Sequence, residues 1–206
     1  LGDVYKRQDP YGVRPLFIGY TKNNEMLFSS EVKAITDVSK SVVPFIPGSY
    51  IILNHNIKDD INYVTYHNYD FTYITDDYDT IKKNIKSLLM QSVKKRLMSD
   101  RPIGCLLSGG LDSSLVSGLV AQHFEPYTLN TFSIGMKGST DLHYAKLAAD
   151  HIKTKHHSIE LTNQEFLDAI EETICIAETY DITTVRGSVG NYVVCIFIYI
   201  FRDWCV

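Results

Sequence analysis

The first third of the chain alternates apolar and polar residues in short runs, a pattern typical of strands joined by turns. Residues 1–8 follow neither a strand nor a helix period, so no element is expected there. Asp9-Pro-Tyr-Gly12 has the residue types of a type I turn. Two strand pairs are predicted beyond it, residues 16–20 with 26–29 and residues 49–53 with 61–66.

A longer period begins near residue 80. Apolar residues then recur at helical spacing, and the acidic stretch before them can cap a helix, which predicts an amphipathic helix over residues 80–98. We place a domain boundary before this helix, with domains at residues 1–70 and 71–206. The residues expected to share the buried face are Ile81, Ile85, Leu88, Leu89, Val93 and Leu97.

The rest of the chain alternates short apolar runs with helical patterns, and this predicts an α/β fold, a parallel sheet with helices on both faces. Thr162-Asn-Gln-Glu165 has the residues of a capping box that opens the last predicted helix. Ligands of such sheets bind at the carboxyl ends of the strands. The predicted strands are 103–107, 131–135 and 157–161, and the helices are 113–121, 142–151 and 163–178.

Composition excludes several classes of function. The 206 residues carry 20 Lys and Arg against 24 Asp and Glu, a net charge of -4 without a basic patch, so no nucleic-acid or membrane partner is expected. The four cysteines have no zinc-binding spacing, which suggests a reducing cytoplasmic location. The longest apolar run, residues 193–201, is shorter than the ~20 residues of a spanning helix, and no such helix is expected.

Both ends of the sequence are unusual. The first residue is Leu1, and residues 191–206 abandon the polar and apolar pattern that precedes them. An incomplete or disrupted reading frame would explain both features.

The candidate chemistry lies between the predicted strand 103–107 and helix 113–121. Glycines let the backbone turn tightly and approach an anion, and free amides at a helix start attract negative charge. A carboxylate in such a cradle would repel a phosphate unless a cation lay between them, so Asp112 is the expected ligand of Mg²⁺. An ordinary glycine-rich turn is the competing interpretation. The phosphate-binding residues are Ser108, Gly109, Gly110, Asp112, Ser113 and Ser114.

Ser108-Gly-Gly-Leu-Asp-Ser-Ser114 resembles the signature loop of the ATP pyrophosphatases, which cleave ATP between its α and β phosphates. Two other stretches resemble the glutamine-dependent asparagine synthetase family. Asp9-Pro-Tyr-Gly-Val-Arg-Pro-Leu-Phe17 is similar to the late part of its N-terminal-nucleophile glutaminase domain, and Glu178-Thr-Tyr-Asp-Ile-Thr-Thr-Val-Arg186 to a segment of its synthetase domain. The resemblance covers about residues 9–192, with Gly187 where the family usually has alanine.

This resemblance implies that the chain is part of an enzyme that uses aspartate, ATP and glutamine to make asparagine through β-aspartyl-AMP, and that could form a homodimer. Residues 1–70 would then be a β-rich remnant of the glutaminase domain, and residues 71–206 part of the ATP-pyrophosphatase domain. Thr183, Thr184 and Arg186 would contact the pyrophosphate or the adenylate. Leu107, Ile134 and Gly135, at strand ends, would contact ATP, although they also suit a core.

The glutaminase nucleophile and the second phosphate motif of the family are both missing from this sequence, so we expect the chain alone to be inactive. Two alternatives stay open, a non-catalytic nucleotide-binding fragment and another ATP-pyrophosphatase amidotransferase such as a β-lactam synthetase. His156 and His157 suggest a metal pair, but neighbouring residues on a strand point to opposite faces, which favours ordinary histidines.

Overall fold

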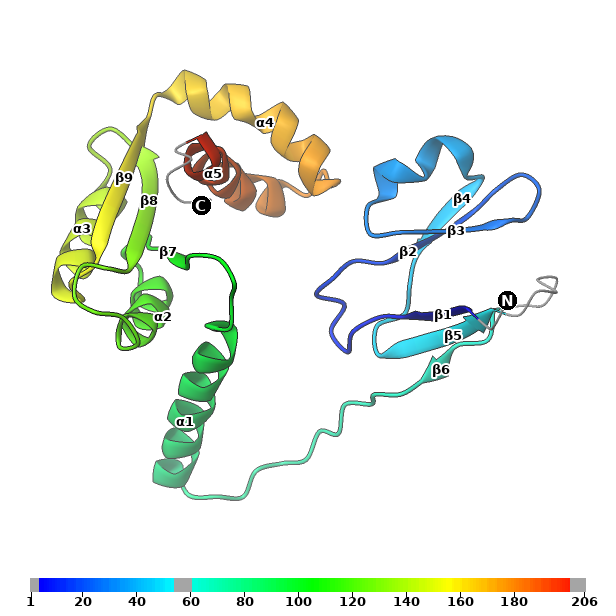
Figure 1. Cartoon of the computed structure of the whole chain (residues 1–206), viewed down its shortest axis with the longest axis horizontal. Helices are drawn as coiled ribbons and strands as arrows, with labels where there is room; N and C mark the ends of the chain where they lie inside the picture. Colours follow the sequence, from blue (N-terminus) through cyan, green and yellow to red (C-terminus); the bar gives the residue numbers. More distant parts are fainter. Residues whose placement is uncertain (1–3, 54–60, 201–206) are drawn as a thin grey trace. The chain divides into compact units, whose positions relative to one another are not determined.

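The computed structural model describes residues 4–53 and 61–200 and divides the chain into two compact units, Leu1–Ile74 and Thr75–Val206 (Figure 1). Each unit has its own strands and core, and each is described by itself. The boundary observed between the units lies a few residues beyond the one placed from the sequence.

The first unit holds two antiparallel sheets. One is ordered β1 (Val4–Arg7), β5 (Ser49–Leu53), β6 (Val64–Thr65), and the other β3 (Met26–Ser29), β2 (Phe17–Tyr20), β4 (Ser41–Pro44). Two short 3-10 helices, η1 (Val32–Ala34) and η2 (Thr36–Val38), connect β3 to β4. The buried core consists of Ile18, Phe45 and Ile51.

Both predicted strand pairs form, β2 with β3 and β5 with β6. The expectation that residues 1–8 lack an element is wrong, because Val4–Arg7 pairs with residues 50–53 of β5. That pairing comes from a partner about 45 residues away in the sequence, which a local period does not reveal. The turn at Asp9 is confirmed, since its carbonyl accepts a hydrogen bond from the Gly12 N–H at 3.2 Å.

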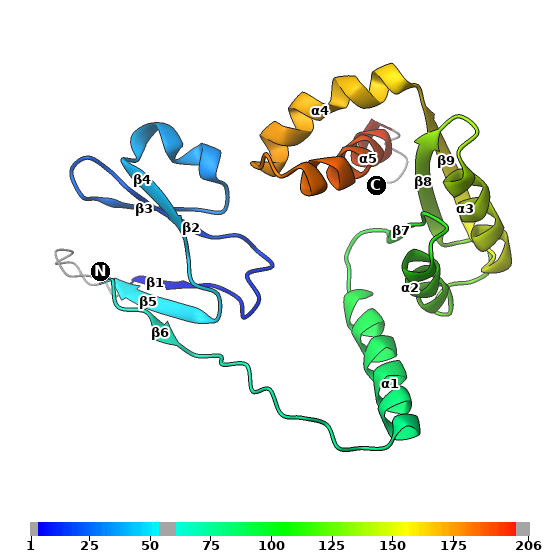
Figure 2. The ribbon, with the colours of Figure 1, turned by 180° about the vertical axis from the view of Figure 1, so that it is seen from behind.

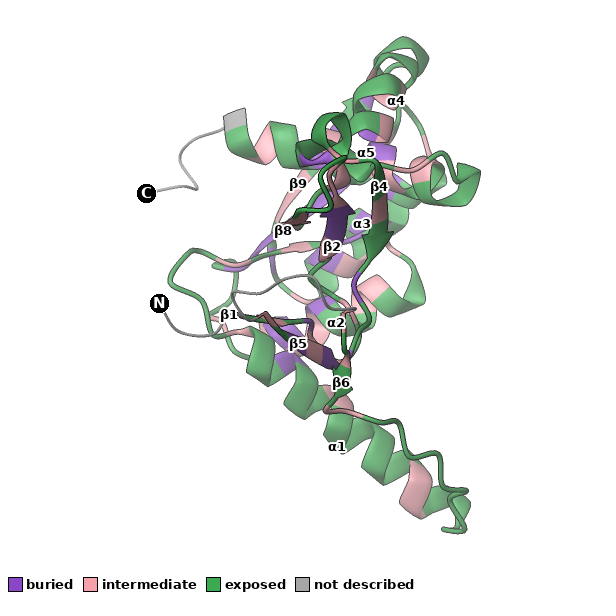
Figure 3. Cartoon of the chain, turned by 90° about the vertical axis from the view of Figure 1, so that its right-hand side faces the viewer, coloured by how far each residue is buried: buried purple, intermediate pink, exposed green. Residues whose placement is uncertain are grey.

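The second unit opens with α1 (Tyr78–Arg96), which begins where predicted because the Asp77 carboxylate accepts hydrogen bonds from the Asp79 and Thr80 N–H groups. Its predicted buried face is confirmed in part, because Ile81, Leu89 and Leu97 are half-buried and Val93 is buried. Val93 is the only buried residue of this helix, whereas Ile85 and Leu88 are 60% and 62% exposed (Figure 3). The reason is that, within the part of the chain the structure describes, α1 contacts mainly α2.

The predicted parallel sheet is present, in the order β7 (Gly104–Leu106), β8 (Asn130–Met136), β9 (Lys155–Leu161). Helices α2 (Leu111–Ala121) and α3 (Thr140–His151) cover one face, while α4 (Asn163–Ala177) and α5 (Ile182–Ile200) pack on the other (Figures 1 and 2). The capping box at Thr162 and Glu165 forms as expected.

Helix α5 differs most from expectation. The sequence abandons its earlier polar and apolar pattern after residue 190, yet Val194 is 2% exposed and packs with Phe132, Ile159 and Leu161. Ile182–Tyr199, with a mean hydropathy of 1.2, is also long and apolar enough to cross a membrane, contrary to the expectation from the short apolar run. Helix α5 contacts α4 and β8, as a helix packed on a sheet does. The core helix of a soluble protein can have the same length and apolar composition as a membrane-spanning helix.

Candidate active site

The phosphate-loop candidate, residues 108–114, joins the end of β7 to the start of α2. Leu107 anchors it, because its side chain is 1% exposed and its N–H donates to the Phe132 carbonyl on β8 at 2.7 Å. Gly110 is the N-cap of α2, and no side chain caps this helix start. The amides of its first turn are therefore directed at the space in front of the loop.

Gly109 brings the loop against α3. Its φ is +79°, and a Cβ there would lie 2.5 Å from the backbone nitrogen of Ala145 and 2.6 Å from the carbonyl carbon of Tyr144. Glycine is thus required both by the left-handed backbone and by the close helix. Gly110 has an ordinary φ of -74°, and a Cβ there would have only the Ser108 hydroxyl nearby, at 3.5 Å.

The hydroxyls of Ser108 and Ser113 hold the shape of the loop. They lie 2.9 Å apart, the Ser113 oxygen accepts from the Ser108 N–H at 3.2 Å, and the Ser113 hydroxyl donates to the Gly110 carbonyl at 3.3 Å. Ser114 instead continues the helix, with its N–H donating to the Gly110 carbonyl at 3.1 Å. The loop is therefore organised before any ligand enters.

Asp112 is exposed and lies in the first turn of α2, where the helix dipole stabilises its negative charge. Among residues 4–53 and 61–200, no group of three or more His, Cys, Asp or Glu could hold a metal ion. A single carboxylate beside a phosphate cradle does suit Mg²⁺, which keeps several water ligands and takes the others from phosphate oxygens.

Ile134 and Gly135 lie on β8, two and three residues beyond the pairing of Leu106 with Phe132. A Cβ on Gly135 would lie 2.6 Å from the Ser139 hydroxyl, so this glycine lets the N-cap of α3 approach the strand. Ile134 packs against the α5 side of the sheet. Ile134 and Gly135 thus lie toward the carboxyl end of β8, in positions that also serve the core, and their contact with ATP stays a prediction.

Thr183, Thr184 and Arg186 lie in the first two turns of α5, next to the end of α4 that is remote from the sheet (Figure 1). The Asp181 carboxylate accepts hydrogen bonds from both the N–H and the hydroxyl of Thr184, at 2.7 Å each, and these bonds lower the pKa of Asp181. Arg186 is exposed and lines a groove between α4 and α5. The role predicted for these three residues stays a prediction.

The two neighbouring histidines point to opposite faces of the sheet, as expected. His156 lies between Thr131 and Ser133, with its ring nitrogens 2.9 and 3.0 Å from their hydroxyls. His157 stacks on Phe132 and contacts the Asn130 side chain at 3.0 Å. Burial is the main cause that lowers the pKa of each histidine.

The sequence motif does not reveal the groups that fix the loop from outside. Tyr144 and Ala145 supply the backbone against which Gly109 packs, and Ala145 is fully buried with Leu107. Asp181 likewise organises the start of α5. The sequence gives only a weak indication of this contact. Small residues such as Ala145 on one face of a helix indicate close packing, but they do not identify the segment that packs against them.

Comparisons with known proteins identify related sequences. A family model described as asparagine synthase matches residues 84–198. Asparagine synthetases [glutamine-hydrolyzing] from Pongo abelii and Homo sapiens are each 39% identical to this chain over 93% of its length. A further one from Gallus gallus is also 39% identical. The chain spans 38% of the length of these relatives.

Proposed function

Because the chain belongs to the asparagine synthase family, we propose that it is part of a glutamine-hydrolysing asparagine synthetase and contains its ATP-binding loop. The observation that carries this proposal is the loop at residues 108–114. It combines an uncapped helix start, a glycine packed against α3 and an exposed carboxylate at the end of a parallel strand. The cytoplasm is the proposed location.

The proposed reaction begins with attack of the aspartate β-carboxylate on the α-phosphorus of ATP, which forms β-aspartyl-AMP and releases pyrophosphate. Ammonia from glutamine then displaces AMP. The loop would stabilise the charge that develops on the leaving pyrophosphate, through backbone amides already held in place by Ser108 and Ser113. When bound, Mg²⁺ would neutralise phosphate charge, with Asp112 as its protein ligand.

Residues 1–70 fit the same proposal as the late part of the glutaminase domain. The support is the stretch Asp9–Phe17, which follows β1 and leads into the β2–β3 hairpin. The first cysteine of this sequence is Cys105, so the nucleophile of glutamine hydrolysis would come from sequence outside this chain. We therefore propose that the 206-residue chain alone does not hydrolyse glutamine.

We keep Thr183, Thr184 and Arg186 as the proposed contacts for pyrophosphate or adenylate. The support is the exposed Arg186 guanidinium and a Thr184 hydroxyl oriented by Asp181. The homodimer expected from the sequence also belongs to the proposal.

Calorimetric titration of the chain with Mg²⁺ and ATP tests the proposed site. Asp112→Asn should abolish the magnesium-dependent part of the binding, because it removes the only carboxylate in the loop. The matched control is Asp141→Asn, which changes an exposed aspartate at the equivalent place in the first turn of α3. Equal affinity in the Asp112 variant and the control would contradict the proposal. A non-catalytic nucleotide-binding protein would bind ATP without releasing pyrophosphate. A pyrophosphate assay on the complete protein therefore distinguishes this alternative from the proposed enzyme.

A further inference from the structure

Tyr144 of α3 lies directly against the phosphate loop, although no sequence motif includes it. A Cβ on Gly109 would lie 2.6 Å from the Tyr144 carbonyl carbon and 2.8 Å from the Tyr144 Cβ. Because position 109 is glycine, no side chain separates the loop backbone from the tyrosine. Tyr144 is 57% exposed, whereas the next residue, Ala145, is fully buried. The tyrosine therefore lies where the packed face of α3 meets the solvent beside the loop.

The direction of the side chain brings the phenol toward the ligand side of the sheet. α2 follows β7 and α3 follows β8, so both helices begin at the carboxyl ends of parallel strands. Side chains on a helix lean toward its N-terminus. The ring of Tyr144 therefore extends toward the level at which the first amides of α2 are unpaired, and away from the amino ends of the strands.

The loop uses its own hydroxyl protons internally. The Ser113 hydroxyl donates to the Gly110 carbonyl at 3.3 Å, and the Ser108 hydroxyl can then donate to the Ser113 oxygen at 2.9 Å. The Ser108 oxygen also accepts from the Gly110 N–H at 3.5 Å. In this arrangement the two serines hold the loop in shape, so a hydroxyl donor to a bound phosphate has to come from outside the loop.

A phenol suits that position. The first-turn amides of α2 favour an anion, but Asp112 adds a negative charge at the same place. A phenol O–H donates to a phosphate oxygen without adding charge of either sign, and hydrogen bonds to ionised acceptors are roughly twice as strong as those between neutral groups.

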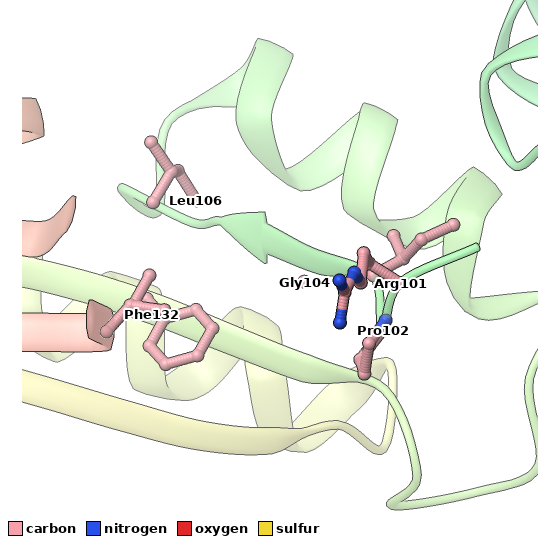
Figure 4. Close-up of a pocket in the computed structure, with 7 residues that line it drawn as sticks. Arg101, Pro102, Gly104, Leu106 and Phe132 are labelled. Carbon is pink, nitrogen blue, oxygen red and sulfur yellow. The ribbon is translucent and has the colours of Figure 1, made fainter. Parts of the chain in front are cut away.

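The surface beside β7 offers no comparable donor. A pocket of about 500 Å³ lies there and is lined mainly by apolar residues such as Leu106 and Phe132 (Figure 4). Arg101 is the only charged residue among the described residues that line it, and it precedes β7, at the end of the strand remote from the loop (Figure 4). The α3 side is therefore the side from which a neutral donor can approach the loop.

We infer that Tyr144 is a further ligand-binding residue, whose phenol O–H donates to the pyrophosphate portion of ATP at the loop. The inference rests on the proposed function, because it adds a residue to the proposed ATP site. The contact belongs to the β and γ phosphates, since these are the groups that the loop is proposed to stabilise. Free pyrophosphate should therefore use the same contact, whereas AMP should not.

Calorimetry of the chain with ATP, pyrophosphate and AMP, each with Mg²⁺, tests the inference. Tyr144→Phe should weaken the binding of ATP and of pyrophosphate about tenfold, because one hydrogen bond to an ionised phosphate is lost. The affinity for AMP should be unchanged. Tyr127→Phe is the matched control, on a 61% exposed tyrosine in the turn before β8, at the amino end of the sheet. It should change none of the three affinities.

Thermal melting separates binding from packing. Phenylalanine keeps the ring, including its edge contact with the His143 ring at 5.5 Å between centroids, so the melting temperature of Tyr144→Phe should equal that of the unmodified chain. A lower melting temperature with unchanged affinities would overturn the inference, and so would an equal loss of affinity for AMP. If ATP binding requires Asp112 but not the Tyr144 hydroxyl, only this inference fails. If the unmodified chain binds neither ATP nor pyrophosphate, the proposed function fails with it.

Discussion

Gly109 and Gly110 are neighbours in one loop, but the protein needs glycine at the two positions for different reasons. At Gly109 the backbone is left-handed and the α3 backbone leaves no room for a Cβ. At Gly110 the backbone is ordinary, and the space where a Cβ would lie is open toward the proposed ligand. Packing therefore requires glycine at position 109, whereas ligand binding requires it at position 110.

Alanine at each position tests this separation. Gly109→Ala should lower the free energy of unfolding of the second unit by about 1–3 kcal/mol, because it combines strain at positive φ with a backbone clash. Gly110→Ala should cost less, about 0.5–1 kcal/mol, because alanine is a poorer N-cap than glycine, and it should weaken ATP binding by placing a methyl group in the cradle. Thermal melting and calorimetry check the two effects, and equal destabilisation by both variants would refute the distinction.

Strands β8 and β9 are joined by a line of polar side chains as well as by their backbones. Thr154 donates to the Ala149 carbonyl, which leaves its oxygen to accept from Thr131 at 2.9 Å. Thr131 can then accept from Nδ1–H of His156, and Nε2 accepts from Ser133. This direction of donors assigns His156 to the neutral Nδ1–H tautomer.

Acidification should therefore destabilise the second unit. Burial and the nearby charges of Lys146 and His157 hold the pKa of His156 below its ordinary value of 6.5, although Asp150 opposes them. Between the folded pKa and 6.5 the unfolded chain binds more protons, so stability is full above pH 6.5 and falls as pH decreases toward the folded pKa.

Denaturant unfolding between pH 7.5 and about 5 checks this dependence, across the range in which an ordinary histidine titrates. His156→Gln, which keeps a neutral donor and acceptor, should make the curve shallower. It should not flatten the curve completely, because the pKa of His157 is lowered as well. His143→Gln on the exposed face of α3 is the control, and a slope that His156→Gln leaves unchanged would exclude the assigned role.

Elements with strong local signals could be predicted from the sequence. The hairpin β2–β3, the capped helices α1 and α4 and the strand–loop–helix of residues 104–121 all have their determinants within a few residues. β1 and α5 could not be predicted, because β1 forms through pairing with β5 and α5 is stabilised by contacts with α4 and β8. The loop of the candidate site was predictable for the same local reason, whereas the position of Arg186 depends on how α4 and α5 pack.

At the scale of the whole molecule, the segment around the boundary between the two units has no regular secondary structure and exposes most of its side chains. Residues 66–76 form neither helix nor strand. Phe71 is 88% exposed and Tyr73 99% exposed, although both are large aromatic residues. Residues 70–76 are all exposed, and such a segment can adopt the extended form that a protease binds at little cost in free energy.

Limited digestion with chymotrypsin, which cleaves after aromatic residues, should therefore cut first after Phe71 or Tyr73 and leave two resistant fragments. Tyr180 is the competing site, since it is also 88% exposed. It lies, however, in a tight turn between α4 and α5, where the Asp181 N–H donates to the Thr179 hydroxyl at 3.1 Å and restricts the backbone. Replacing both Phe71 and Tyr73 with serine should slow the first cut about tenfold, because the two most exposed aromatic residues of the segment are gone while its backbone is unchanged. A first cut after Tyr180 in the unmodified chain would show instead that the α4–α5 connection opens more readily than the segment between the units.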